Sequence, residues 1–179
     1  TIIDDLIVYK LSNTKIMICV NASNIEKDFN WFQKNVSDFD CTLSDRSAEF
    51  SLIAVQGPRT IEALKSLNLG FGLKDISYYS IQEEKSDSNT PILIARTGYT
   101  GEDGFEIFGP HDYIKNLWSQ MIKAGVKPCG LGARDVLRLE VCYPLYGNEL
   151  TDQVTPLDSG LNWTVKMDKR DFIGKNALS

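Results

Sequence analysis

The chain has 179 residues, of which 42% are hydrophobic and 24% are charged, and its formal net charge is -5 at pH 7. This composition is typical of a folded globular protein with one domain or two small interlocked domains. An acidic balance without a basic stripe argues against nucleic-acid binding, and no apolar run approaches the ~18 residues that a membrane-spanning helix needs.

Short runs rich in β-forming residues predict the strands. In the first half of the chain these runs are residues 6–11, 15–20, 41–43 and 50–55. The turn-forming pair Ser12-Asn13 separates the first two runs and predicts a hairpin. In the second half the runs are residues 78–82, 91–96 and 105–108, and residues 83–89 read as a polar loop.

Three segments carry apolar residues at helical spacing. Asn24 can cap a helix that extends to about Asn35, and Pro58 begins a second helix over residues 60–67. A third helix is predicted over residues 111–123, ending at Gly125. Its inward residues are expected to be Tyr113, Ile114, Leu117, Trp118, Met121 and Ile122. Because strands and helices mix without strict βαβ alternation, the sequence predicts an α+β fold with mainly antiparallel sheets and flanking helices.

The most informative stretch is the glycine-dense turn between the last two predicted strands, residues 96–106. A plain hairpin loop is one explanation, since glycine supplies positive φ or close backbone approach. Glu106 favours another, because it lies between apolar Phe105 and Ile107 and is expected within reach of Arg96 and Tyr99. A partly buried carboxylate of this kind can accept hydrogen bonds from adjacent N–H groups of a ligand.

The cysteines and the single histidine limit the chemistry. Four cysteines without C-x-x-C spacing, together with His111 alone, make a dedicated metal site improbable and leave no Ser/His/Asp set. Each cysteine has apolar neighbours, so we expect buried, reduced thiols and a reducing compartment.

Other polar and aromatic groups have two readings each. Asp4 and Asp5 precede a predicted strand. They can be solvated turn residues; alternatively, one of them stabilises positive charge on a reacting nitrogen. Arg134 and Asp135 lie near functional carboxylates, or they form an internal ion pair; the glycines before them do not complete a dinucleotide fingerprint. Tyrosines at 78, 79 and 143 are core residues, or they form a wall for a flat heteroaromatic ligand.

Six motifs in order resemble one family, the aminomethyltransferase (T-protein) of the glycine cleavage system. They are Asp4-Asp5-Leu6-Ile7-Val8-Tyr9, residues 20–28, Gln56-Gly57-Pro58, residues 96–104, Gly132-Ala133-Arg134-Asp135 and Leu145-Tyr146-Gly147-Asn148. The resemblance implies α+β and β domains around a tetrahydrofolate cavity, of which this chain is the central part. On this basis the N-terminal segment and the C-terminal domain are absent, and residues of about 1–44 and 45–179 belong to two interlocked subdomains.

The resemblance also implies the reaction and the residues that carry it. A one-carbon unit passes from the aminomethyl-lipoyl arm of H-protein to tetrahydrofolate, and ammonia is released; no metal takes part. Asp5 matches the family's essential aspartate, with Asp4 as the alternative, and Glu106 matches the carboxylate that grips the pterin. Further residues match positions that line the folate site: Asn21, Tyr78, Tyr79, Arg134 and Tyr143.

Two rival families share related folds. One is the folate-binding tail of dimethylglycine and sarcosine dehydrogenases. The other is a non-transferase folate-binding protein of iron–sulfur cluster assembly, which carries a Lys-Gly-Cys-Tyr-x-Gly-Gln-Glu motif. The pair Cys142-Tyr143 of this chain matches that motif only superficially. Plentiful lysine, asparagine and isoleucine suggest a low-GC bacterium and hence the cytoplasm, with the mitochondrial matrix as the alternative.

Overall fold

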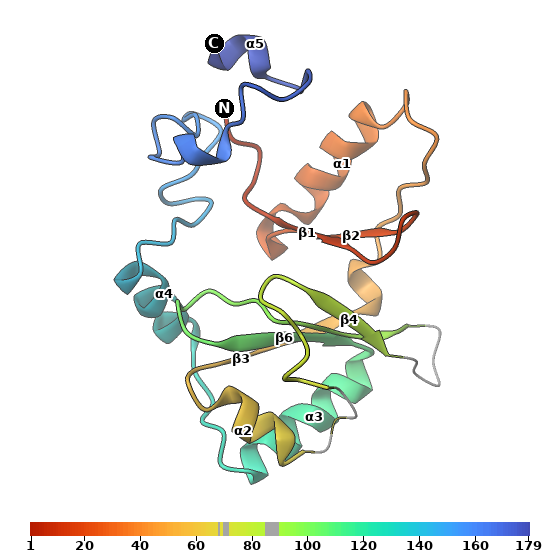
Figure 1. Cartoon of the computed structure of the whole chain (residues 1–179), viewed down its shortest axis with the longest axis vertical. Helices are drawn as coiled ribbons and strands as arrows, with labels where there is room; N and C mark the ends of the chain where they lie inside the picture. The colour runs from red at the N-terminus through yellow and green to blue at the C-terminus, as the bar shows by residue number, and fades with distance from the viewer. Residues whose placement is uncertain (68, 70–71, 85–89) are drawn as a thin grey trace. The chain divides into compact units, whose positions relative to one another are not determined.

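The computed structural model describes residues 1–67, 69, 72–84 and 90–179. The chain separates into two compact units (Figure 1). Unit 1 comprises Thr1–Ile7, Cys19–Cys41 and Pro144–Ser179, and unit 2 comprises Val8–Ile18 and Thr42–Tyr143. These bounds differ from the predicted subdomains of about 1–44 and 45–179, because the last 36 or so residues belong with the first seven rather than with the sheet. The predicted place of the chain as the central part of a larger protein stays a prediction.

Unit 2 is built on a four-stranded sheet with the order β3-β6-β5-β4, in which every neighbouring pair is antiparallel. The strands are β3 (Ser51–Gln56), β4 (Ile81–Glu84), β5 (Ile92–Ala95) and β6 (Gly104–Gly109). The pairing of β5 with β6 confirms that the glycine-dense turn joins two neighbouring strands. The α+β fold with mainly antiparallel sheets is likewise confirmed.

Helices α2 (Thr60–Lys65) and α3 (His111–Lys123) lie on one face of this sheet (Figure 1). Alternate strand residues point toward them, and Phe105 and Ile107 of β6 are both fully buried. Together with the helices they form one core, whose members are Ile53, Val55, Leu64, Leu73, Ile76, Ile94, Phe105, Ile107, Ile114, Leu117 and Met121. Since side chains alternate along a strand, Glu106 and Phe108 point to the other face.

The short hairpin of β1 (Ile7–Lys10) and β2 (Ile16–Cys19) confirms the predicted pairing of the first two strands. Tyr9 of β1 is buried and packs edge-on against Phe108, with ring centroids 6.0 Å apart. Both rings belong to unit 2, so Tyr9 covers the sheet face that carries Glu106. Helix α4 (Leu131–Glu140) follows α3 in the same unit.

Unit 1 contains α1 (Ile25–Asn35), which ends where the sequence predicts, and the terminal helix α5 (Lys175–Leu178). Short 3-10 turns occur at Ala22–Asn24, Ser47–Glu49 and Asn162–Thr164 along the chain. Asn24 precedes α1 but makes no side-chain cap, and its amide Nδ2 donates to Oδ1 of Asp4. No helix among the residues that the structure describes is long and apolar enough to cross a membrane.

Four details of the sequence prediction are wrong. Residues 41–43 form no strand, since the run is short and no neighbouring strand pairs with it. The predicted strand at 78–82 begins only at Ile81, because Tyr79 has a φ of 58° and turns the chain. Trp118 and Ile122 of α3 are 46% and 39% exposed, so the buried stripe of the helix is narrower than expected. The predicted polar loop lies partly in β4, and its residues 85–89 fall outside the described residues.

The expectation for the cysteines is also corrected. All four are free thiols, but Cys41, Cys129 and Cys142 are exposed, and only Cys19 is half-buried. Apolar sequence neighbours therefore did not indicate burial at three of the four positions.

Candidate functional site

Unit 1 gathers the predicted reaction aspartate into a polar group that we call the aspartate cluster: Asp4, Asp5, Asn21, Asn24 and Asp28. Asn21 lies at its centre. Its side-chain Nδ2 is 3.0 Å from Oδ1 of Asp4, from Oδ1 of Asp5 and from the backbone oxygen of Asp5. One carboxamide therefore fixes both acids relative to each other.

Asp5 is held through one of its two carboxylate oxygens. Oδ1 accepts from Nδ2 of Asn21 and, at 3.2 Å, from the backbone N–H of Tyr146. Burial and the neighbouring charge of Asp4 raise the pKa of Asp5, while these two donors work against that rise. Both of these donors reach Oδ1, so Oδ2 is the oxygen that a ligand can meet.

Asp4 accepts three N–H donors. The backbone N–H of Asn21 reaches Oδ2 at 3.2 Å, while Nδ2 of Asn21 and Nδ2 of Asn24 reach Oδ1 at 3.0 and 2.8 Å. Burial raises the pKa of Asp4, but hydrogen bonds from Asp28, Asn21 and Asn24 outweigh burial, so that the pKa lies below its usual value. Asp4 is thus committed to orienting its neighbours, and Asp5 is the acid that is more available to a ligand.

Asp28 was not predicted to matter and is the one buried residue of α1. Its side chain is 1% exposed, and neither carboxylate oxygen has a partner that donates an N–H or O–H in the described residues. Burial, followed by the adjacent Asp4, raises the pKa of Asp28 to about 7. A carboxylate inside an apolar helical stripe is the signal that could have drawn attention to it, since such a group needs a partner.

Unit 2 holds Glu106 in a second group, the Glu106 cluster, which consists of Tyr9, Thr97 and Glu106. The Thr97 hydroxyl donates to Oε2 of Glu106 at 2.6 Å, and the Tyr9 hydroxyl lies 3.4 Å from the same oxygen. The two hydroxyl oxygens are 3.1 Å apart. Both donors point at one oxygen, which leaves Oε1 of the half-buried carboxylate available to adjacent N–H groups.

Arg96 does not pair with Glu106, contrary to expectation. Its guanidinium instead makes a bidentate ion pair with Asp103, with distances of 2.9 and 2.8 Å, and also donates to the backbone oxygen of Ile76. The Arg96 guanidinium holds the pKa of Asp103 below its usual value. This pair spans the glycine-dense turn and fixes its shape. Arg96 therefore stabilises the turn, whereas Glu106 contacts Thr97 and Tyr9.

Gln56 anchors the same turn from β3. Its Nε2 donates to the backbone oxygens of Thr97 and Phe105, at 3.1 and 3.4 Å. The amide fills the space beside Gly98 and Gly104: a Cβ on these residues would lie 1.8 and 2.2 Å from Oε1 of Gln56. Both glycines are therefore required for close approach.

A small hollow of about 210 Å³ lies beside this turn, and we call it the tyrosine pocket. Tyr78, Tyr79 and Tyr143 line it together with Arg96 and glycines of the turn. Tyr78 and Tyr79 are 61% and 80% exposed, which excludes the core-packing explanation for both. The Arg96 guanidinium lies 4.4 Å from the ring centroid of Tyr78.

Arg134 and Tyr143 meet at Tyr99. The rings of Tyr99 and Tyr143 stack with centroids 5.6 Å apart, and the Arg134 guanidinium lies 4.7 Å from the Tyr99 ring. Asp135 of α4 forms an ion pair with Arg138, at 2.8 Å, rather than with Arg134. Arg134 is thus placed by an aromatic face, a contact that guanidinium groups favour.

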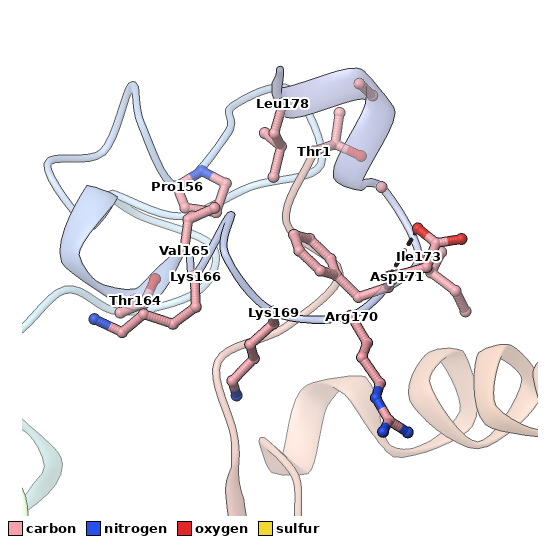
Figure 2. A pocket seen from close by; sticks show the side chains of 13 residues that line it. Thr1, Pro156, Thr164, Val165, Lys166, Lys169, Arg170, Asp171, Ile173 and Leu178 are labelled. Atoms are coloured by element: carbon pink, nitrogen blue, oxygen red, sulfur yellow. Dashed lines mark hydrogen bonds between the residues drawn. The ribbon is translucent and has the colours of Figure 1, made fainter.

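A larger hollow of about 660 Å³ lies in unit 1 (Figure 2). Its walls come from Thr1, Pro156 and residues between 164 and 178, and Lys169 and Arg170 extend away from Pro156 and Leu178 in the view of Figure 2. None of the predicted site residues lines it, so size alone does not make it the functional site. In the described residues, no three His, Cys, Asp or Glu side chains are grouped to hold a metal ion.

The comparisons with known proteins agree with this fold and with these motifs. Residues 1–169 match the family model described as the GCVT N-terminal domain, and the chain belongs to this family. Its relatives are aminomethyltransferases: those of Thermoanaerobacter pseudethanolicus and Thermosipho melanesiensis are 45% and 48% identical over 99% and 98% of the chain. The crystal structure of glycine cleavage system aminomethyltransferase T from Bartonella henselae superposes with a TM-score of 0.88, at 34% identity and over 98% of the chain.

These matches confirm the predicted family resemblance. They also set its extent, because the chain covers 49% and 48% of the two curated relatives and 48% of the solved structure. The chain therefore spans about half the length of the proteins that it matches.

Proposed function

We propose that this chain is the tetrahydrofolate-binding part of an aminomethyltransferase of glycine cleavage. In this function a one-carbon unit passes from the aminomethyl-lipoyl arm of H-protein to tetrahydrofolate, and ammonia is released. The relatives named aminomethyltransferase, which match nearly the whole chain, support this reading over a dehydrogenase tail or an iron–sulfur assembly protein. Because these relatives come from bacteria, the cytoplasm is the proposed location.

The observation that carries the proposal is the way in which Asp5 is held. Two N–H donors, from Asn21 and Tyr146, bind Oδ1 and fix the carboxylate plane. The other oxygen can then accept from, or lie beside, a nitrogen that becomes positively charged during transfer. A fixed negative charge in a partly buried place stabilises such a nitrogen without having to reorganise.

The Glu106 cluster and the tyrosine pocket fit a pterin. Oε1 of Glu106 can accept from adjacent N–H donors of the ring, because Thr97 and Tyr9 already occupy Oε2. Exposed Tyr78 and Tyr79 offer flat apolar faces, and Tyr143 and Arg134 flank Tyr99 nearby. When bound, tetrahydrofolate supplies the nitrogen that accepts the one-carbon unit.

Asn21 has a different proposed task from the other folate residues. Its carboxamide nitrogen is committed to Asp4 and Asp5, so we assign it to orienting the reaction aspartate rather than to contacting the pterin through that nitrogen. Lipoylated H-protein is the proposed macromolecular partner.

The test is ammonia release from H-protein that carries the aminomethyl group on its lipoyl arm, with and without tetrahydrofolate. The full-length wild-type protein should release ammonia in a folate-dependent manner. Asp5→Asn keeps the shape but removes the charge, and it should lower kcat roughly 100-fold, the size seen when one electrostatic stabiliser is lost. Asp152→Asn, an exposed acid of the same unit, is the matched control and should keep the wild-type rate.

Two results would contradict the proposal. One is a folded wild-type protein that releases no ammonia from loaded H-protein. The other is an Asp5→Asn variant as active as the Asp152→Asn control, which would remove Asp5 from the reaction.

A further inference from the structure

Asp28 is the buried acid that the proposed reaction does not use directly. Its side chain is 1% exposed, and no N–H or O–H group in the described residues donates to either oxygen. An ionised carboxylate without donors is costly to bury. The adjacent group is the carboxylate of Asp4, which can itself only accept hydrogen bonds when ionised.

One proton resolves the contact between these two acids. Asp4 disfavours the charged form of Asp28, and two adjacent like charges oppose simultaneous ionisation, so one member of the pair keeps its proton. Asp4 accepts three N–H donors from Asn21 and Asn24, which stabilise its charged form. Asp28 accepts no such donor, so Asp28 keeps the proton and uses it to donate a hydrogen bond to Asp4.

The contact continues from Asp4 to the reaction aspartate. Nδ2 of Asn21 carries two hydrogens and lies 3.0 Å from three acceptors, two of which belong to Asp5 and one to Asp4. A charged Asp4 draws one hydrogen, which directs the other toward Asp5. The orientation of the carboxamide at Asp5 therefore depends on the state of Asp4.

We propose that Asp28 is a positioning residue for transfer: as a neutral acid it donates to Asp4, which orients Asn21 and, through Asn21, the carboxylate of Asp5. The inference rests on the proposed function for the role of Asp5 in the reaction. The burial of Asp28 without a donor and the hydrogen bonds that lead from Asp4 through Asn21 to Asp5 are independent of that role.

This arrangement makes the site sensitive to pH near neutrality. The charged groups around Asp28 are Asp4 and Asp5 from the N-terminal segment and Lys27 from α1. Asp4 and Asp5 favour the neutral form of Asp28, and Lys27 opposes them; the Lys27 ammonium also donates to the backbone oxygen of Ile3 and lies 3.7 Å from the Tyr146 ring centroid. As pH rises through about 7, Asp28 loses its proton and Asp4 loses its donor.

Two variants separate the donor from the charge. Asp28→Asn keeps an N–H donor and cannot ionise, whereas Asp28→Leu has the same number of side-chain heavy atoms and no donor. In the full-length wild-type protein, kcat/KM for ammonia release should fall as pH rises through about 7. Asp28→Asn should lose this inflection and keep the activity seen below it, while Asp28→Leu should be roughly tenfold less active throughout, the effect of losing one hydrogen bond to a charged group. Exposed Asp38→Asn is the control and should behave as wild type.

A second measurement does not depend on activity. The carboxyl ¹³C signals of Asp5 and Asp28, followed against pH, report their protonation directly. Asp28 should titrate near 7 in the wild type, and the Asp5 titration should move in Asp28→Leu but not in Asp28→Asn. If Asp5 titrates alike in all three proteins, the inference is wrong whatever the activity.

The kinetic outcomes are equally decisive. An inflection that persists in Asp28→Asn belongs to another group and overturns the inference, as does Asp28→Leu with wild-type kinetics. A wild-type protein that transfers nothing, but whose Asp5 signal responds to Asp28→Leu as expected, contradicts the proposed function and leaves the contact from Asp28 to Asp5 established.

Discussion

Gly98→Ala tests whether the glycine-dense turn is shaped by contact with Gln56. The added Cβ would lie 1.8 Å from Oε1 of Gln56, far inside van der Waals contact, so the Gln56 amide must move. Moving it breaks its hydrogen bonds to the backbone oxygens of Thr97 and Phe105. At ~1 kcal/mol net for each bond, the free energy of unfolding should fall by ~2 kcal/mol.

The effect should reverse when Gln56 is removed. In a Gln56→Ala background the three atoms nearest the added Cβ, all from the Gln56 amide, are gone, and φ of Gly98 lies outside the left-handed region. Alanine then reduces the entropy of the unfolded chain and should stabilise by up to ~1 kcal/mol. The interaction energy of the double-mutant cycle should therefore be ~2–3 kcal/mol.

Urea unfolding of the wild type, both single variants and the double variant, followed by circular dichroism, measures this cycle. Gly132→Ala is the control, since no atom lies within 4 Å of its added Cβ and it lies in α4, where alanine is favoured. An equal cost of Gly98→Ala in both backgrounds, with an interaction energy below ~0.5 kcal/mol, would refute the steric argument.

Three further predictions concern the same unit. Glu106→Gln should weaken 5-formyltetrahydrofolate binding at least tenfold in calorimetry, about 1.4 kcal/mol, because a charged acceptor is lost; unchanged binding would place the pterin elsewhere. Because Arg96 lowers the pKa of Asp103, their pair stabilises the fold at pH values above the unfolded pKa of 3.8, and this contribution is lost as the pH falls below that value. Asp103→Asn should therefore flatten the acid side of a profile of melting temperature against pH. An unaltered profile would show that the pair adds little to stability. Tyr79→Gly should raise the melting temperature, since a left-handed φ of 58° costs a non-glycine residue ~1 kcal/mol. The same variant should weaken binding of 5-formyltetrahydrofolate. A lower melting temperature would mean that the exposed ring supports the fold.

The strand pattern predicted the setting of Glu106 correctly. Phe105 and Ile107 alternate with it and are fully buried, so the period of two placed the carboxylate on the opposite face. The partners of Glu106 were not predictable in the same way. Arg96 was nearer in sequence, but the turn brings Asp103 back to Arg96, while Tyr9 comes from a hairpin 97 residues away.

Asp28 shows a second limit of the sequence. The apolar residues of α1 indicated which face is inward, and Asp28 lies next to them at helical spacing. The influence of Asp4 on its pKa comes from 24 residues earlier, and no local pattern reports it. The cysteines were misjudged for the related reason that apolar neighbours in sequence are not neighbours in space.

The interleaving of the two units has a consequence for the order of folding. The chain passes from one unit to the other four times, and unit 1 combines its first residues with Pro144–Ser179. The backbone N–H of Tyr146 binds Asp5, and the N–H of Ile2 binds the oxygen of Val154, across more than 140 residues. Contacts so distant in sequence form late, because a long loop must close first. During synthesis the sheet of unit 2 can therefore assemble from a continuous stretch, whereas the surroundings of Asp5 are completed only after the ribosome has passed residue 146.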